Sequence, residues 1–189
     1  MAPSAAPEAF TRAVAGLRAA APREEILLEE IAAPQRLAPY GFAFAATVLR
    51  DDDEVASGRL ILLHDPAGHD AWQGTLRLVT LVTAELEPDL AGDPLLPAVA
   101  WSWLTDALDL NGAAHTAIGG TITQTASTRF GELAGPPPGA DVEIRASWTP
   151  TSDDLGAHLH AWCTLLASTA GLPPPGVTAL SDRHRAGAG

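Results

Sequence analysis

The hydrophobic pattern of the chain alternates at every second position in several segments, which is typical of β-strands. The clearest example is residues 141–149, where one face carries only apolar side chains: Val142, Ile144, Ala146 and Trp148. The same alternation predicts strands at 40–49, 59–64, 75–86 and 115–128. Because alternation leaves one face polar, it indicates an antiparallel sheet that is covered on one side only.

Helical spacing of apolar residues appears in three other segments. Residues 7–19 carry Phe10, Val14 and Leu17 along one stripe, and Leu155 begins a similar stripe before Gly171. A further helix is predicted between Asp93-Pro94, a good helix start, and Asn111-Gly112, a good stop. Its core-facing stripe is predicted to hold six residues: Leu96, Val99, Ala100, Trp103, Ala107 and Leu110. Residues 24–31 fit a helix or a strand equally well.

These elements predict an α+β fold with the order α-βββ-α-ββ-α. We expect a single antiparallel sheet of about five strands, with the helices packed on one face. One domain over residues 7–171 accounts for all the patterned segments. The Gly- and Pro-containing remainder, residues 172–189, is predicted to be a disordered C-terminal tail.

The composition narrows the class of protein. The formal net charge is −12, and all eleven basic residues are arginines scattered along the chain, so nucleic-acid binding is unlikely on electrostatic grounds. The lone Cys163 excludes an internal disulfide and fits a reducing compartment. No segment has the pattern of a signal peptide or the length of a membrane span, so we expect a cytoplasmic protein without membrane contact.

The segment from Leu63 to Gly74 contains the densest cluster of chemically capable side chains. Its two His-Asp pairs, His64-Asp65 and His69-Asp70, are candidate metal ligands for a metal-dependent hydrolase. The alternative is a turn formed by Asp65-Pro66 and Gly68, with the histidines at strand ends. Because the cluster lacks the fixed spacing of known metal motifs, we favour the turn and predict no cofactor.

Candidate binding residues come from two further places. Trp101, Leu104 and Leu108 widen the apolar arc of the second predicted helix, and they form either a subunit contact or a site covered by another helix. Trp72 lies in the polar segment before Gly74, and exposed Trp is typical of interfaces. Arg145 lies near a Thr-rich polar sheet face formed by Thr121, Thr123, Thr125 and Ser127.

Several motifs together resemble a known family. They are Ala33–Tyr40, Leu63–Gly68, Trp72–Gly74, Trp101–Thr105 and Ile144–Pro150. The chain resembles, from Arg12 to Gly171, an uncharacterised actinobacterial family of unknown function, number three thousand of the domain-of-unknown-function series. The resemblance implies a bacterial cytoplasmic setting and no activity.

The predicted element order is also similar to that of small secretion chaperones, which are acidic dimeric modules that wrap client peptides. A shared topology does not determine a function. It agrees with the absence of any catalytic motif in the sequence. We therefore expect a non-catalytic module that binds a protein or peptide, acts in a chaperone-like way and associates as a homodimer.

Overall fold

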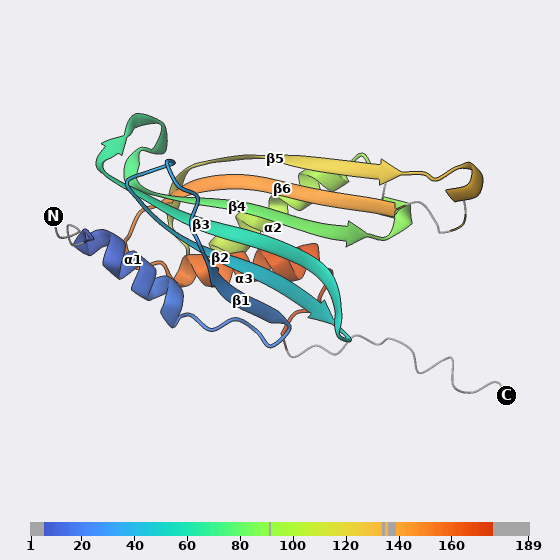
Figure 1. The fold of residues 1–189 in the computed structure, drawn as a ribbon, viewed down its shortest axis with the longest axis horizontal. Helices are drawn as coiled ribbons and strands as arrows, with labels where there is room; N and C mark the ends of the chain where they lie inside the picture. Colours follow the sequence, from blue (N-terminus) through green and yellow to red (C-terminus); the bar gives the residue numbers. More distant parts are fainter. Residues whose placement is uncertain (1–5, 91, 134, 136–138, 176–189) are drawn as a thin grey trace.

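The computed structural model describes residues 6–90, 92–133, 135 and 139–175. Its centre is one antiparallel sheet with the strand order β1-β2-β3-β4-β6-β5. The strands are β1 (Ile26–Ile31), β2 (Tyr40–Arg50), β3 (Asp53–His69), β4 (Gly74–Leu86), β5 (His115–Ser127) and β6 (Gly139–Pro150). The helices are α1 (Glu8–Ala19), α2 (Leu96–Leu110) and α3 (Gly156–Thr169). In Figure 1 the strands lie in front of α2 and α3, which cover the far face of the sheet.

The predicted α+β class and single antiparallel sheet are confirmed. The segment that fitted either a helix or a strand is β1, so the sheet has six strands and four of them precede α2. Asp51 and Asp52 form the hairpin tip that connects β2 to β3, with φ values of 51° and 69°. The strand predicted at 59–64 is much longer, because β3 continues beyond His64 to His69.

The covered face holds the core. Trp148 of β6 and Trp162 of α3 are fully buried there. The indole Nε1 of Trp162 donates to the Thr80 hydroxyl at 2.7 Å, which satisfies both polar groups away from water. Gly58 of β3 lies directly below this ring, since an added Cβ would come within 3.1 Å of Trp162. The small residue of β3 thus leaves room for the large ring of α3, and the helix packs closely against the sheet.

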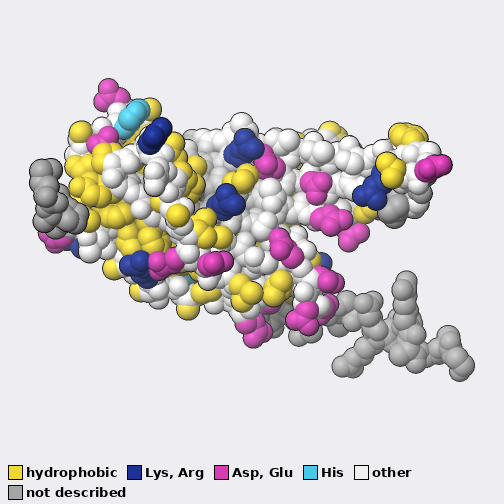
Figure 2. All heavy atoms as spheres, in the orientation of Figure 1, with side chains coloured by type: hydrophobic (Ala, Val, Ile, Leu, Met, Phe, Trp, Pro, Cys, Tyr) yellow, Lys and Arg dark blue, Asp and Glu magenta, His cyan; other side chains and the backbone are white. Residues whose placement is uncertain are grey.

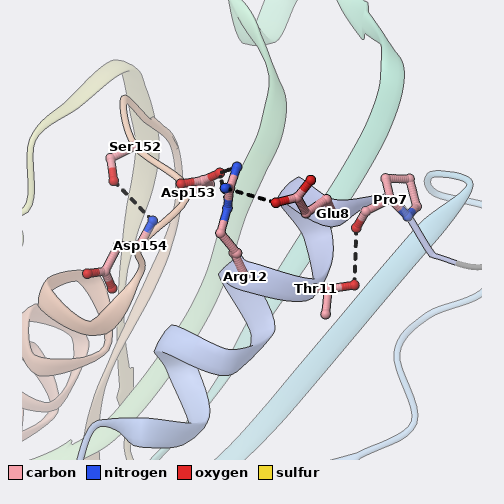
Figure 3. A network of polar contacts seen from close by, with 7 residues as sticks. All are labelled: Pro7, Glu8, Thr11, Arg12, Ser152, Asp153 and Asp154. Carbon is pink, nitrogen blue, oxygen red and sulfur yellow. Dashed lines mark hydrogen bonds and ion pairs between the residues drawn. The ribbon is translucent and has the colours of Figure 1, made fainter.

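Helix α1 is joined to the segment that precedes α3. Arg12 Nε donates to the Asp153 carboxylate at 2.8 Å, and the same guanidinium contacts Glu8 at 3.2 Å (Figure 3). Gly16 allows the close approach, because a Cβ there would stand 2.8 Å from the Leu155 backbone nitrogen. The helix therefore packs beside α3 and completes the covered side of the sheet.

The predicted core-facing stripe of α2 is correct for three of its six residues, Leu96, Ala100 and Ala107. The buried residues of the helix are Leu96, Ala100, Leu104, Ala107 and Leu108, whereas Val99 and Leu110 of the predicted stripe are exposed. Leu104 and Leu108 are fully buried, and Trp101 packs against the same core while partly exposed. The wide apolar arc serves two contacts, one with the sheet and one with α3, so these three residues do not form a free contact surface.

Two further expectations concern the ends of the chain and the membrane. Of the predicted tail, 176–189 lies outside the described residues, while the Pro173 carbonyl accepts a hydrogen bond from Arg23 Nη1 at 3.0 Å. No helix within the described segments is long and apolar enough to cross a membrane.

Candidate binding surface on the open sheet face

The face of the sheet opposite the helices has no cover from any described helix. Its central side chains are apolar but only half-buried, among them Ile61 of β3 and Val79 and Leu81 of β4. Figure 2 shows this face: hydrophobic side chains gather toward the end where β3 turns into β4, and acidic side chains gather toward the other end. Apolar surface left open beside charged groups is typical of contact surfaces.

A hollow of about 460 Å³ lies on this face over β3, β4, β6 and β5. Its floor is formed by Ile61, Val79 and Leu81, and its far side by Gly119 and Gly120 of β5. Gly119 leaves the hollow open, because a Cβ added to it would meet no atom within 4 Å. The hollow is therefore open beside Gly119, where the edge strand has no side chain on the open face.

Two arginines stand in the same cross-strand row of this hollow. Arg59 is paired with Leu81, and Leu81 is paired with Arg145 on the other side. The two guanidinium groups therefore flank one leucine, with their Cα atoms about 10 Å apart. Both side chains are exposed, and Arg145 Nε pairs with Glu143 at 2.7 Å. No hydrogen bond or ion pair of the Arg59 side chain is found within the described part of the chain.

A third arginine lies beneath the edge of the hollow. Arg77 is only 9 % exposed, and desolvation by burial lowers the pKa of its guanidinium. It donates to the Ala117 carbonyl at 2.8 Å, to the Thr149 hydroxyl at 3.0 Å and to the Ser147 hydroxyl at 2.7 Å. All three acceptors are neutral, so this buried cation has hydrogen bonds but no carboxylate partner in the described structure.

The acceptors of Arg77 belong to an irregular part of β5. The pairing with β6 shifts between Thr116 and Gly119, and Ala117 has a φ of 50°, which is uncommon for a residue with a side chain. Gly120 follows at a point where a Cβ would overlap the Arg145 carbonyl oxygen. Arg77 thus ties the bulge of the edge strand to β6 and holds the side of the hollow in place.

The structure separates the four residues of the predicted metal site. His64 is buried on the covered face, where its ring clusters with those of Phe10 and Tyr40. Its Nδ1 lies 3.0 Å from the Thr75 carbonyl, and its Nε2 has no hydrogen-bond partner among the described residues. Asp65 accepts from the Ala67 amide, as a turn residue does. Nowhere in the described residues do three or more His, Cys, Asp or Glu side chains form a group that could hold a metal.

The other half of that segment is a structural connection. His69 accepts from the Ala71 amide through Nδ1 and stacks on Trp72, with ring centroids 5.2 Å apart. The Trp72 carbonyl accepts from the Thr149 hydroxyl at 2.5 Å. Asp70 begins the short 3₁₀ turn, and Gln73 ends it with a φ of 57°. The two His-Asp pairs therefore shape the β3–β4 connection, and the hydrolase alternative has no assembled site there.

Two buried groups with chemical potential are also accounted for. His158 accepts a hydrogen bond from Trp148 Nε1 at 3.1 Å, and burial lowers the pKa of His158 to about 4, so the ring is neutral at physiological pH. Burial raises the pKa of the Cys163 thiol to about 12, which keeps it protonated and unreactive. Both groups belong to the core.

Sequence reasoning found Arg145 and missed Arg59 and Arg77. The expected grouping of Thr121 and Thr123 with Arg145 and Glu143 is confirmed by their direct pairing across β5 and β6. Arg59 and Arg77 lie far from Arg145 in the chain, and only the pairing of β3, β4 and β6 brings them together. Their position on the polar face of alternating strands was the available signal.

Comparison with known proteins identifies the family. The chain matches no curated protein and no solved structure. The model of one family, described as Protein of unknown function (DUF3000), matches residues 6–178 and thus includes all the helices and strands described above. The chain therefore belongs to the DUF3000 family.

Proposed function

We propose that this protein is a non-catalytic module that binds a partner protein on the open face of its sheet. One observation carries the proposal: the face holds half-exposed apolar side chains and a hollow lined by two exposed arginines, and no described helix covers it. The buried, neutral His158 and the protonated Cys163 offer no reactive group in competition. The single cysteine supports a cytoplasmic, reducing setting for the module.

Site-specific photo-crosslinking in the native cell tests this proposal. A photoreactive phenylalanine analogue replaces Leu81 in the floor of the hollow, and a control carries it in place of Leu110, which is 79 % exposed on α2. We expect a discrete crosslinked protein from position 81 and none from position 110. Absence of any crosslink from position 81, in a protein that unfolds like the wild type, would contradict the proposal.

Self-association is a second part of the proposal, and a different observation favours it. The edge strand β5 is 13 residues long and carries no Asp, Glu, Lys or Arg. An uncharged edge strand can pair with a second copy, whereas charges and Pro normally prevent such pairing. In a chain with a net charge of −12, this edge lets two copies approach without direct repulsion.

Light scattering tests this second part. We expect a dimer for the wild type and a monomer for the double variant Thr123→Lys with Thr125→Lys, because lysines on an edge strand oppose pairing. Lysines at Ser102 and Asp106 on α2 provide a control away from the edge. A monomeric wild type, or a dimer that the β5 lysines leave intact, would rule out the edge contact.

A further inference from the structure

The hollow on the open face differs in charge from the rest of the chain. Its lining includes Arg59 and Arg145 but no acidic residue, although acidic side chains outnumber basic ones by 12 over the whole chain. Glu143 and Glu29 are the nearest acidic positions in the strand pairing, and Glu143 is already paired with Arg145. Anionic groups are therefore repelled by the net charge of this protein and attracted to this hollow.

The opposite end of the same face carries negative charge instead of positive charge. A second depression there is lined by Glu54, Glu85 and Asp141 together with the hydrogen-bonded pair Ser57 and Thr83. A ligand lying along the face therefore meets positive charge at one end and negative charge at the other. This difference gives an anionic ligand one preferred position and orientation.

The arginines are arranged to receive carboxylates. Arg59 has a planar guanidinium fork with no partner in the described structure, and such forks bind carboxylates through two parallel hydrogen bonds. Below them, the Ser147 hydroxyl oxygen accepts from Arg77, so its own hydrogen is left to donate into the hollow. The buried Arg77 adds positive potential, because charges act more strongly where water is excluded.

The shape of the hollow decides the size of the ligand. Sheet strands form its floor, and its side at Gly119 is open, so it does not enclose a compact small molecule as most small-ligand sites do. An extended chain suits it better, because alternate side chains of an extended segment point to the same side about 7 Å apart. An apolar side chain over Gly119 and Leu81 would place the side chains two residues before and after it on the same side of the segment, so acidic residues at those two positions would lie near the two arginines.

We propose that this hollow binds an extended segment of a partner protein in which acidic and apolar residues take turns at every second position, along the side that faces the sheet. Its carboxylates pair with Arg59 and Arg145, and its apolar side chain fills the space above Gly119. The inference rests on the proposed function and specifies the chemistry of the partner. Phosphate groups also pair with arginine, but two exposed arginines on a chain of net charge −12 fall short of a nucleic-acid footprint.

Fluorescence anisotropy with labelled peptides tests the proposal. The probe is a peptide of about twelve residues that repeats Glu-Ser-Leu-Ser, which places Glu and Leu on one side of an extended chain, and matched peptides carry Lys or Gln in place of Glu. We expect the Glu peptide to bind the wild-type protein at least about tenfold more tightly than the Lys peptide. Binding should weaken as NaCl is raised from about 50 to about 500 mM. Equal binding of the Glu and Lys peptides would overturn the proposal.

Three variants locate the contact. Arg59→Glu should weaken binding of the Glu peptide about tenfold, while the matched Arg129→Glu, an exposed arginine beyond the end of β5, should leave it within about twofold. Gly119→Leu should also weaken binding about tenfold, because its side chain occupies the hollow without meeting other atoms near its Cβ. Unchanged binding in both Arg59→Glu and Gly119→Leu overturns the proposal.

Two further arms separate this inference from its alternatives. Displacement of the peptide by a short single-stranded DNA that also depends on Arg59 would overturn it in favour of a nucleic acid. Repeating the photo-crosslink at position 81 in the Arg59→Glu protein tests separately whether the open face binds a partner and whether the arginines recognise it. A crosslink that persists there keeps the open face as the binding surface and overturns the role of the arginines. Loss of the crosslink in Arg59→Glu, with retention in Arg129→Glu, supports that role.

Discussion

The two faces of the sheet are built from the same strands, yet neighbouring residues have opposite roles. Leu60 and Leu62 of β3 are fully buried under the helices, whereas Ile61 between them is half-exposed on the open face. In β4, Leu78 is buried and Val79 is not. Hydrophobicity alone therefore does not distinguish the core from the proposed binding surface here. What distinguishes them is the presence of α2 and α3 on one side.

The polar groups differ between the faces as well. On the covered face, the indole groups of Trp148 and Trp162 each have a buried hydrogen-bond partner. On the open face, Arg59 has none in the described structure, and Arg145 has only its neighbour Glu143. The two indole groups on the covered face thus stabilise the fold, while the guanidinium of Arg59 on the open face is available to a ligand. Each prediction below compares the two faces, beginning with the largest expected effect.

Truncating one large side chain on each face should lower the free energy of unfolding by very different amounts. Trp162→Ala removes a fully buried ring and leaves the Thr80 hydroxyl without its donor, so the free energy of unfolding should fall by about 3–5 kcal/mol. Leu81→Ala on the open face should cost under about 1.5 kcal/mol, because part of that side chain is already in water. Urea unfolding followed by circular dichroism measures both. Similar costs would mean that the open face is covered in solution.

The pH dependence of stability should come from the covered face. Burial, with a smaller contribution from His115, lowers the pKa of His158 from 6.5 to about 4, so the unfolded chain takes up this proton first as the pH falls. The contribution of His158 to the free energy of unfolding is therefore fully present above pH 6.5. It is lost as the pH falls toward 4, and the total loss is about 3 kcal/mol.

His158→Gln is the matched variant for this prediction, since it keeps a neutral acceptor for Trp148 but does not titrate. Unfolding by urea at several pH values between 4 and 7 should show a shallower decline in stability for the variant. The carboxylates of the chain titrate in both proteins and cancel in the comparison. If the free energy of unfolding falls in parallel with pH in the two proteins, the pKa of His158 is not lowered in the folded state.

The sequence predicted the covered face better than the open face, for a physical reason. Alternation correctly identified the inward residues of β6, and helical spacing identified α1 and α3, because both patterns depend on local periodicity. In α2 the apolar arc is so wide that periodicity did not show which side meets the sheet, and Leu104 and Leu108 were left open between a subunit contact and burial under another helix. Residues 26–31 lacked a clear period, so β1 was left open between helix and strand.

The proposed site depends on pairing that no local pattern encodes. Arg59, Arg77 and Arg145 come from three strands, and the insertion of β6 between β4 and β5 sets the row that brings Arg59 and Arg145 to either side of Leu81. The His64–Asp70 cluster is the opposite case. Its residues are close in sequence, yet strand geometry turns His64 into the core and leaves His69 at the surface. In both places, distance along the chain did not predict which side chains lie together in the structure.

Two adjacent glycines of β5 provide a finer comparison of the faces. Gly120→Ala should lower the free energy of unfolding by about 1–3 kcal/mol, because its Cβ would overlap the Arg145 carbonyl oxygen and lie 2.9 Å from the Ala146 Cα. Gly119→Ala should change it by under about 0.5 kcal/mol, since its Cβ points into the open hollow. Thermal and urea unfolding of the two variants measure the difference. Equal costs would show that β5 is not held against β6 as described.

The smallest effect on stability is expected from the residue most important to the proposed contact. Arg59→Ala removes an exposed guanidinium that has no partner in the described structure, so the free energy of unfolding should change by under about 0.5 kcal/mol. Arg77→Ala is the comparison: it removes three hydrogen bonds and leaves the Ala117 carbonyl without this donor, so it should cost about 1–3 kcal/mol. Urea unfolding measures both. A large loss in Arg59→Ala would show that this arginine serves the fold, and its free guanidinium would no longer indicate a ligand.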